Sequence, residues 1–396
     1  MTPNGAPHES RSESRVTTVD CLRGLAASAV VWFHLTNGNP QAYSPAWLRA
    51  SGHQGWLGVQ LFFVISGFVI PYALHRANYH LRDYGPFLLR RLIRLEPPYF
   101  ASILLTMVLA YASAAVPGFR GQPPSYTLPL IVSHIAYANG FFGFPSINSV
   151  YWSLSLELQY YLLLGLLFPL VGNKHRAVRI GALVSLGAFA LALPSLLLVF
   201  RWLFLFTLGI LAFNVRERMV SVAEYAIGVS LATAGAYMTL GGGTAAVGVA
   251  TTLLIAFVTV RSRPLLFLGD ISYSLYLVHV PIGGRIINAT TRVELGPMTV
   301  TLVTVTAFGV CVAVAYVFHR LIERPARAWA ARIHYGDRRE PRSALDRPLG
   351  ESASTAHPGF APVVDPGARA LDTGSATGGG FESNGRSATG NPELRK

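Results

Sequence analysis

The sequence is poor in charge, and above all in acidic residues. Only 13% of its 396 residues are charged, and 32 lysines and arginines stand against 19 acidic residues. A soluble globular chain carries about a quarter charged residues, so the composition argues against a cytosolic enzyme. With 52% hydrophobic residues and a mean hydropathy of +0.41, most of the chain is also too apolar for a disordered protein.

Cysteine is scarce, and a signal-peptide pattern is missing. Cys21 and Cys311 each lie in or beside a long apolar run. Two such residues build neither a disulfide framework nor a metal cluster, so no metal site is expected. We interpret both as small buried hydrophobic residues. Residues 1–18 are polar and lack the apolar stretch of a cleavable signal peptide, so we expect membrane insertion to begin at the first apolar segment.

The net charge of +13 does not indicate a nucleic-acid-binding protein. The basic residues stand in short clusters between apolar runs, which is how membrane proteins distribute positive charge. Since a helix needs about 20 apolar residues to cross a bilayer, the pattern predicts ten spans. They lie near residues 19–36, 56–74, 87–115, 150–171, 178–197, 199–215, 222–240, 244–260, 267–287 and 298–320. The Pro97-Pro98 pair favours a turn inside the third span.

The positive-inside rule decides how the ambiguous apolar stretch 128–144 is interpreted. If this stretch spanned the bilayer, the basic cluster at residues 174–179 would lie outside. If it is re-entrant or interfacial, every basic loop and both termini are cytoplasmic, and the glycine loop 241–243 is outside. We therefore predict an all-α polytopic protein of the inner membrane, with about ten transmembrane helices plus one re-entrant or interfacial segment.

Three regions follow from this topology. Residues 1–18 are expected to form a polar cytoplasmic N-terminus, and residues 19–333 a membrane domain. Residues 334–396 change abruptly to glycine, serine, alanine, proline and mixed charges. A segment of that composition cannot bury a core, so we expect a disordered cytoplasmic tail.

Glu157, Arg23 and His34 are ionisable residues within predicted spans. An ionisable residue at membrane depth is costly and indicates function by default, although Glu157 could instead hold helices together by hydrogen bonding. Arg23 and His34 are eleven residues apart, which places them on nearly one helical face with a rise of about 16 Å. His34 and Glu157 are expected at similar depth, where a histidine beside a carboxylate can take a proton from a hydroxyl. A purely structural role for His34 is the alternative.

Two interpretations are open for a group of arginines and for one further histidine. Arg90, Arg91 and Arg94 form a basic cluster before the proline pair. They either anchor the helix at lipid headgroups or clamp the phosphates of a large anionic cofactor, which guanidinium groups suit. His279 lies about eleven residues into its span, as a polar helix contact or a second group at an acceptor site.

Six sequence segments resemble, in order, those of the acyltransferase family 3 membrane enzymes. The first is LRGLAASAVVWFH, with its Arg-x10-His spacing. It is followed by GVQLFFVISGFVI, RRLIRLEPPYF, YWSLSLELQYYL, LGDISYSLYLVHVP and IERP. Any one segment is weak evidence, but six in the same order are strong, and together they extend over about residues 17–333.

The resemblance implies an integral-membrane O-acyltransferase. Such enzymes move an acyl group, often acetyl, from cytoplasmic acyl-CoA to a hydroxyl of a carbohydrate or related acceptor, with no permanently bound cofactor. Position by position, Arg23 and His34 match the family's Arg-x10-His pair. Glu157 matches the acid of the WSLS segment, and Arg91 and Arg94 belong to the basic segment before Pro97.

The sequence departs from the family pattern at two positions. Gln60 stands where many members carry aspartate, and Leu158 where many carry a second glutamate. Glu157 is therefore the sole carboxylate of its segment. No esterase-like domain follows the last predicted span, so a second step on the acceptor is expected to need another protein.

The predicted mechanism has the arginines bind acyl-CoA, His34 act as general base on the acceptor hydroxyl, and Glu157 orient His34. The acceptor stays open among lipopolysaccharide, capsule, peptidoglycan, an exported oligosaccharide and a macrolide-like small molecule. The alternative function is a proton-coupled secondary transporter or flippase of an envelope glycan precursor, in which His34 and Glu157 relay protons. That alternative predicts inverted repeats, and the sequence shows no such internal symmetry.

Overall fold

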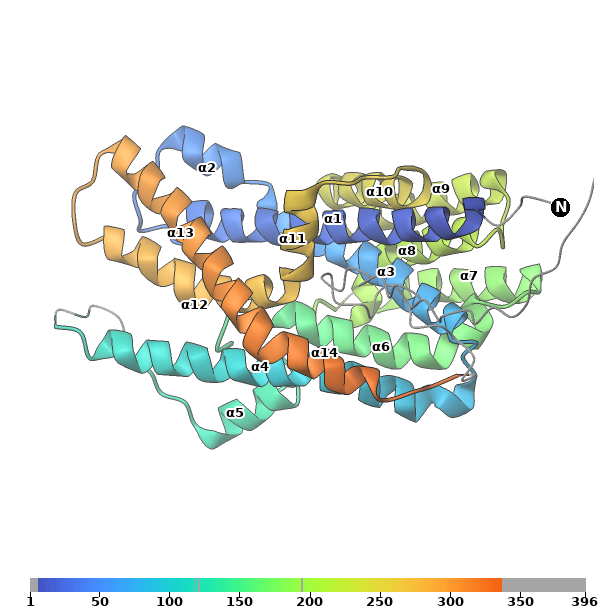
Figure 1. The fold of residues 1–396 in the computed structure, drawn as a ribbon, viewed down its shortest axis with the longest axis horizontal. Helices are drawn as coiled ribbons and strands as arrows, with labels where there is room; N and C mark the ends of the chain where they lie inside the picture. The colour runs from blue at the N-terminus through green and yellow to red at the C-terminus, as the bar shows by residue number, and fades with distance from the viewer. Residues whose placement is uncertain (1–5, 118, 120–121, 194, 337–396) are drawn as a thin grey trace, which may run out of the picture. The chain divides into compact units, whose positions relative to one another are not determined.

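The computed structural model describes residues 6–117, 119, 122–193 and 195–336, with side chains from residue 17 onward. Within these residues every regular element is helical (Figure 1). The α-helices are α1 (Ala6–Asn37), α2 (Ala46–Gly52), α3 (Gly58–Arg76), α4 (Tyr84–Ala114), α5 (Leu128–Ile135), α6 (Trp152–Val171), α7 (Arg176–Ala192), α8 (Leu203–Arg216), α9 (Val222–Leu240), α10 (Gly242–Phe257), α11 (Arg263–Asp270), α12 (Ser272–Thr290), α13 (Pro297–Phe318) and α14 (Arg324–Ala331). Short 3-10 turns η1 (Gly55–Leu57), η2 (Leu81–Asp83) and η3 (Val199–Trp202) and the π-helical turn η4 (His319–Glu323) join some of them.

Several helices are long and apolar enough to cross a membrane. Five helical stretches of the described chain meet that test: Ala46–Arg76, Leu81–Ala114, Trp152–Val171, Val199–Arg216 and Pro297–Ala331. The pair α11 and α12, bent by 74°, would add a sixth. Large apolar side chains such as Met298 and Met238 are 77% and 75% exposed, as expected of surfaces that face lipid. The chain is a membrane protein.

Each of the ten predicted spans coincides with a helical segment of the described chain, with two differences in form. The first helix begins at Ala6 and so extends into the N-terminal region that precedes the predicted span. The ninth is divided by the bend between α11 and α12. The predicted tail, apart from residues 334–336, lies outside the described residues.

The turn expected at Pro97-Pro98 is wrong, because α4 continues through both prolines. A proline pair removes two backbone donors from the helical ladder. Within a membrane such a break is tolerated where neighbouring helices satisfy the freed backbone groups. The carbonyls that the two prolines leave without a helical donor are those of Ile93 and Arg94. Beside them, the Tyr273 hydroxyl of α12 donates to the Leu95 carbonyl at 2.9 Å and ties α12 to α4.

The ambiguous stretch 128–144 contains only the short helix α5. Its eight residues rise about 12 Å, less than half of the hydrocarbon thickness. The fully buried His134 holds it in place, since its Nδ1 donates to the Leu130 carbonyl and its Nε2 accepts from the Ile147 amide. This stretch therefore does not cross the membrane as one helix.

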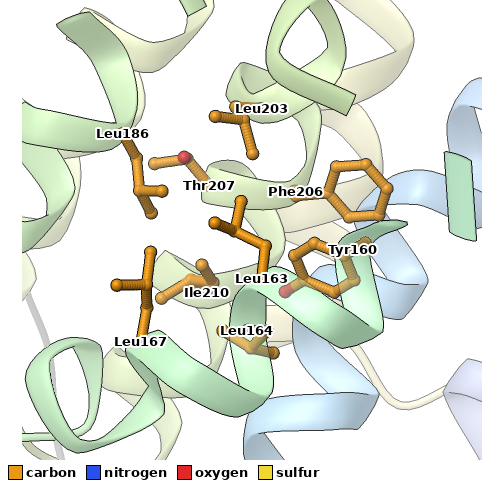
Figure 2. A pocket seen from close by; sticks show the side chains of 9 residues that line it. All are labelled: Tyr160, Leu163, Leu164, Leu167, Leu186, Leu203, Phe206, Thr207 and Ile210. Atoms are coloured by element: carbon orange, nitrogen blue, oxygen red, sulfur yellow. The ribbon is translucent and has the colours of Figure 1, made fainter. Parts of the chain in front are cut away.

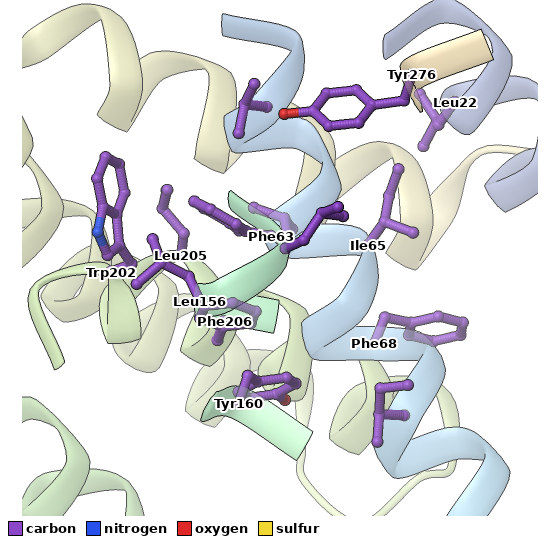
Figure 3. Packing of buried hydrophobic residues seen from close by; sticks show 14 of the residues in the cluster. Leu22, Phe63, Ile65, Phe68, Leu156, Tyr160, Trp202, Leu205, Phe206 and Tyr276 are labelled. Carbon is purple, nitrogen blue, oxygen red and sulfur yellow. The ribbon is translucent and has the colours of Figure 1, made fainter. Parts of the chain in front are cut away.

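The α3–α8 crossing lies at the centre of the core (Figure 3). Phe63 of α3 packs on Trp202 and Phe206 with ring centroids 5.3 and 5.1 Å away. The two backbones approach so closely that a Cβ on Gly67 would lie 2.2 Å from the Phe206 carbonyl oxygen. Only glycine permits that distance, which explains the glycine at this position of α3.

The helices α6, α7 and α8 line a small apolar hollow of about 10 Å³ (Figure 2). Its lining is almost wholly leucine, isoleucine and phenylalanine, with the hydroxyls of Tyr160 and Thr207 as its polar groups. No titratable acid or base of the predicted site borders it, so the chemistry must lie elsewhere.

Candidate functional site

Helix α1 carries Arg23 and His34 as the sequence predicts. Both residues are half-buried, and the helix is unbroken between them, so they are separated by about 16 Å along one face. The Arg23 end is fixed by the closest approach of α1 to α11. A Cβ on Gly24 would lie 2.2 Å from the Leu265 carbonyl oxygen, and one on Gly269 would lie 2.1 Å from that of Asp20.

The hydrogen-bonding partner of His34 on another helix is His279 of α12. Its Nε2 lies 3.3 Å from Nδ1 of His34, and the ring centroids are 4.9 Å apart. His279 is only 1% exposed. Its Nδ1 lies 3.1 Å from the Leu275 carbonyl and 2.8 Å from the Tyr276 carbonyl. Nδ1 of His34 also lies 2.9 Å from the Val30 carbonyl.

These contacts assign the protons of the histidine pair. Carbonyl oxygens only accept, so Nδ1 of His279 carries its proton and its Nε2 is an acceptor in the neutral ring. Nδ1 of His34 then donates to both Val30 and His279. The consequence is that Nε2 of His34 keeps its lone pair and is the basic atom of this site.

Glu157 is not brought to His34. The Tyr161 hydroxyl, one turn later on α6, donates to its Oε1. Among the described residues, the hydrogen-bond partners of His34 are Val30 and His279. The position that the sequence analysis gave to Glu157 beside His34 is taken by His279, because α12 rather than α6 packs on this part of α1.

Glu157 instead belongs to a basic cluster on α4. The Arg91 guanidinium lies 5.7 Å from the ring centroid of Tyr161, the partner of Glu157, and 5.7 Å from that of Phe87. Arg94 lies within electrostatic range of Arg91, Arg23 and Arg327. We call Arg23, Arg91, Arg94 and Arg327 the arginine cluster.

The Arg90 guanidinium lies 5.5 Å from the ring centroid of Tyr335. Electrostatic range groups Arg91 and Arg94 with Arg23. The Nε atom of Arg91 is buried and has no hydrogen-bond partner in the described chain. An unsatisfied guanidinium nitrogen inside a positive cluster is the arrangement expected of an anion site.

A buried ionic network beside the arginine cluster was missed by the sequence analysis. Glu323 of η4, 1% exposed, accepts from the Ser274 hydroxyl at 2.5 Å, from His319 at 3.1 Å and from Arg327 at 2.5 Å. Arg327 also donates to Asp270 at 3.0 Å. The network joins α14 to the bend between α11 and α12.

Sequence signals for this network existed. Glu323 lies in the IERP segment, and Asp270 directly precedes the bend. The guanidinium of Arg327 is bound inside the fold by these two acids.

Glu96 is a second missed acid. It lies beside the Tyr137 hydroxyl, and its Oε2 is buried without a partner in the part of the chain that is described. An acid directly before the proline pair of a predicted span was the available signal.

The structure also places Gln60 and the two cysteines. Gln60, where many family members carry aspartate, is 3% exposed, and its amide nitrogen donates to the Trp56 and Leu57 carbonyls at the start of α3. Cys21 and Cys311 are free and buried. Within the described residues, no group of three or more histidine, cysteine or acidic side chains could hold a metal ion.

Comparison with known proteins matches residues 16–319 to the acyltransferase 3 family model, described as an acyltransferase domain. A Komagataeibacter xylinus protein provisionally named membrane-bound transacylase BcsY is 31% identical over 189 residues, 44% of this chain and 43% of that protein. A Bacillus subtilis protein provisionally named peptidoglycan O-acetyltransferase YrhL is 31% identical over 191 residues, 45% of this chain and 28% of YrhL.

The Staphylococcus aureus O-acetyltransferase OatA is 27% identical over 366 residues, covering 78% of this chain and 57% of OatA. The chain thus spans between 28% and 57% of the length of these relatives. No solved structure matches.

Proposed function

Because the chain belongs to the acyltransferase 3 family, we propose that it is a membrane O-acyltransferase that moves an acyl group, acetyl in the first instance, from acyl-CoA to a hydroxyl of a carbohydrate or related acceptor. The relative named as a peptidoglycan O-acetyltransferase, YrhL, favours an envelope glycan as the acceptor. No cofactor is bound permanently; acyl-CoA is a substrate.

The observation that carries this proposal is the histidine pair. With its proton held on Nδ1 by Val30 and His279, His34 presents an unprotonated Nε2. That atom takes the proton of the acceptor hydroxyl, and the oxygen attacks the thioester carbonyl. The carbon–sulfur bond then breaks, an ester forms, and the proton passes to the sulfur of CoA. His279 acts as a positioning residue, because it touches His34 rather than the reacting atoms.

The arginine cluster supplies the donor-binding end. Guanidinium groups bind phosphates in a bidentate manner, and the buried unpartnered Nε of Arg91 fits a bound anion. Arg23 lies about 16 Å along α1 from His34. The phosphates of CoA can thus bind at the cluster while its extended pantetheine arm carries the thioester toward His34. Glu157, through Tyr161, positions the cluster rather than the base.

The membrane arrangement proposed is ten spans in the inner membrane, with residues 1–18 and 334–396 in the cytoplasm and residues 19–333 as the membrane domain. The positive-inside pattern supports this orientation and sets the arginine cluster at the cytoplasmic side, where acyl-CoA is made. The transporter alternative is disfavoured, because its proposed relay pair, His34 and Glu157, share no hydrogen bond.

The test uses the purified full chain in detergent with acetyl-CoA and, separately, glycan analysis of a deletion strain that carries the chain on a plasmid. We expect loss of ester-linked acetyl from envelope glycans in the deletion strain and its restoration by the chain. His34→Ala should reduce restoration by about 10²-fold or more. A His34→Ala protein present at normal level that restores full acetylation would overturn the proposal.

A further inference from the structure

The chain remains packed on the fold for a few residues after its last helix. Residues 332–336, which we call the strap, leave α14 and reach the turn between α3 and α4 (Figure 1). Residues 334–336 belong by composition to the polar tail. Two of them nevertheless make close contacts with the membrane domain, beside the start of the helix that carries Arg91.

The end of the strap lies directly on the end of α3. Gly336 has a φ of +78°, and a Cβ at this position would lie 1.7 Å from the carbonyl oxygen of Ala77, the residue that follows α3. Any residue other than glycine would have to move away from this contact. Glycine at position 336 therefore fixes where the strap ends, and with it the place of Tyr335.

Tyr335 completes a cluster of aromatic rings at the start of α4. Its ring centroid lies 5.7 Å from that of Phe87 and 6.4 Å from that of Tyr79, both in edge-to-face geometry. Phe87 is fully buried. The Tyr79 hydroxyl donates to the Gly165 carbonyl at 2.8 Å and so ties the cluster to α6. Edge-to-face pairs favour a defined relative orientation, so Tyr335 limits the orientations open to Phe87.

Phe87 connects the strap to the arginine cluster. It lies one turn before Arg91 on the same face of α4, and the Arg91 guanidinium lies 5.7 Å from its ring centroid. The ring of Tyr161 lies at the same distance. Two rings thus orient the guanidinium whose Nε is buried without a hydrogen-bond partner in the described chain. One of these two rings is held by Tyr335.

We propose that Tyr335 is a positioning residue for the acyl donor: the strap fixes Phe87, and Phe87 fixes Arg91 for the phosphates of acyl-CoA. The inference rests on the proposed function. A side chain that is already oriented loses less conformational freedom when its ligand binds. Without Tyr335, Phe87 loses a neighbour that limits its orientation, and Arg91 is ordered less well before the phosphate binds. Donor affinity therefore falls, whereas bond making at His34 does not change.

The test combines calorimetry with CoA and acyl-transfer kinetics on the purified full chain. Tyr335→Ala should raise the dissociation constant for CoA and KM for acetyl-CoA by about three- to fivefold, with kcat unchanged. The loss should be smaller than that from Arg91→Ala, because the guanidinium is kept. Tyr335→Phe keeps the ring and should behave as wild type. Gly336→Ala cannot keep the contact with Ala77 and should reproduce the effect of Tyr335→Ala.

Tyr316→Ala is the matched control. The ring of Tyr316 also lies near a guanidinium, that of Arg320 at 6.0 Å. It belongs to α13, however, and packs on Phe267 of α11. Its removal should leave the dissociation constant for CoA unchanged. A loss of CoA affinity in Tyr316→Ala as large as that in Tyr335→Ala would overturn the proposal, because any surface aromatic ring would then have the same effect.

The decisive comparison places Tyr335→Ala in the Arg91→Ala background. If the strap acts through Arg91, the double variant should bind CoA no more weakly than Arg91→Ala alone. Losses that multiply would overturn the proposal, because Tyr335 would then act on the donor by another route. An unchanged dissociation constant in Tyr335→Ala, or a fall in kcat at constant KM, would overturn it as well. Failure of the wild-type chain to bind CoA would refute the proposed function itself, which is a distinct result.

Discussion

Replacing His279 by leucine tests the proposed proton arrangement more directly than replacing the base. Leucine fills the site of His279, which is 1% exposed, with an apolar side chain of similar size. It lacks the acceptor nitrogen, Nε2 of His279, that lies 3.3 Å from Nδ1 of His34. Val30 still accepts from that nitrogen at 2.9 Å, so His34 keeps its tautomer and loses one of its two orienting bonds.

The magnitude follows from the charge that develops during the reaction. In the resting pair the bond is between neutral rings and contributes about 1 kcal/mol. When His34 takes a proton, the same bond becomes charge-assisted and about twice as strong. The transition state therefore loses about 1 kcal/mol more than the ground state does, which corresponds to a fall in kcat of about 5-fold.

The assay is steady-state acyl transfer by purified variants, with His279→Gln as the conservative control. The glutamine carbonyl can accept from Nδ1 of His34, so this variant should recover most of kcat, and KM for acyl-CoA should not change in either variant. Equal losses in the leucine and glutamine variants, or a loss confined to KM, would refute the positioning role. Protein yield and CoA binding report on folding.

Three further predictions follow. Arg91→Ala should raise KM for acyl-CoA by about tenfold, whereas Arg90→Ala should have little effect; equal effects would mean that both only anchor lipid. Because His34 and Glu157 share no hydrogen bond, the losses from His34→Ala and Glu157→Gln should multiply in the double variant, and a double variant no worse than either single one would restore them as a unit. His134 lies outside the spans, and burial lowers the pKa of its imidazole below 6.5. The hydrogen bond from the Ile147 amide to Nε2 of His134 requires the neutral imidazole. This bond therefore stabilises the fold fully above pH 6.5, and the stabilisation is lost as the pH falls. His134→Gln should flatten the dependence of Tm on pH between 7.5 and 5.

The helices were largely predictable from the sequence, because apolar runs of about 20 residues report directly on membrane-spanning segments. The spacing of Arg23 and His34 along α1 was also predictable, since it depends only on helical geometry. The turn predicted at Pro97-Pro98 was wrong, because prolines remove helical hydrogen bonds without by themselves ending a helix that is packed among others.

The partner of His34 could not be found by the same reasoning. His279 is 245 residues away in sequence, and its effect depends on which helix packs on α1. Depth alone favoured Glu157, the one acid between residues 100 and 173, but depth does not determine which helices are neighbours. Tertiary packing assigned that carboxylate to Tyr161 and the imidazole to α12.

Helix α12 connects the two ends of the site physically. Near its start, Ser274 donates to Glu323, which also binds Arg327 of the arginine cluster. Five residues later the same helix presents His279 to His34. Between them Tyr276 is held by Ser153 at 2.6 Å. One helix therefore carries both a residue that fixes the acid bound to Arg327 and the residue that orients the base.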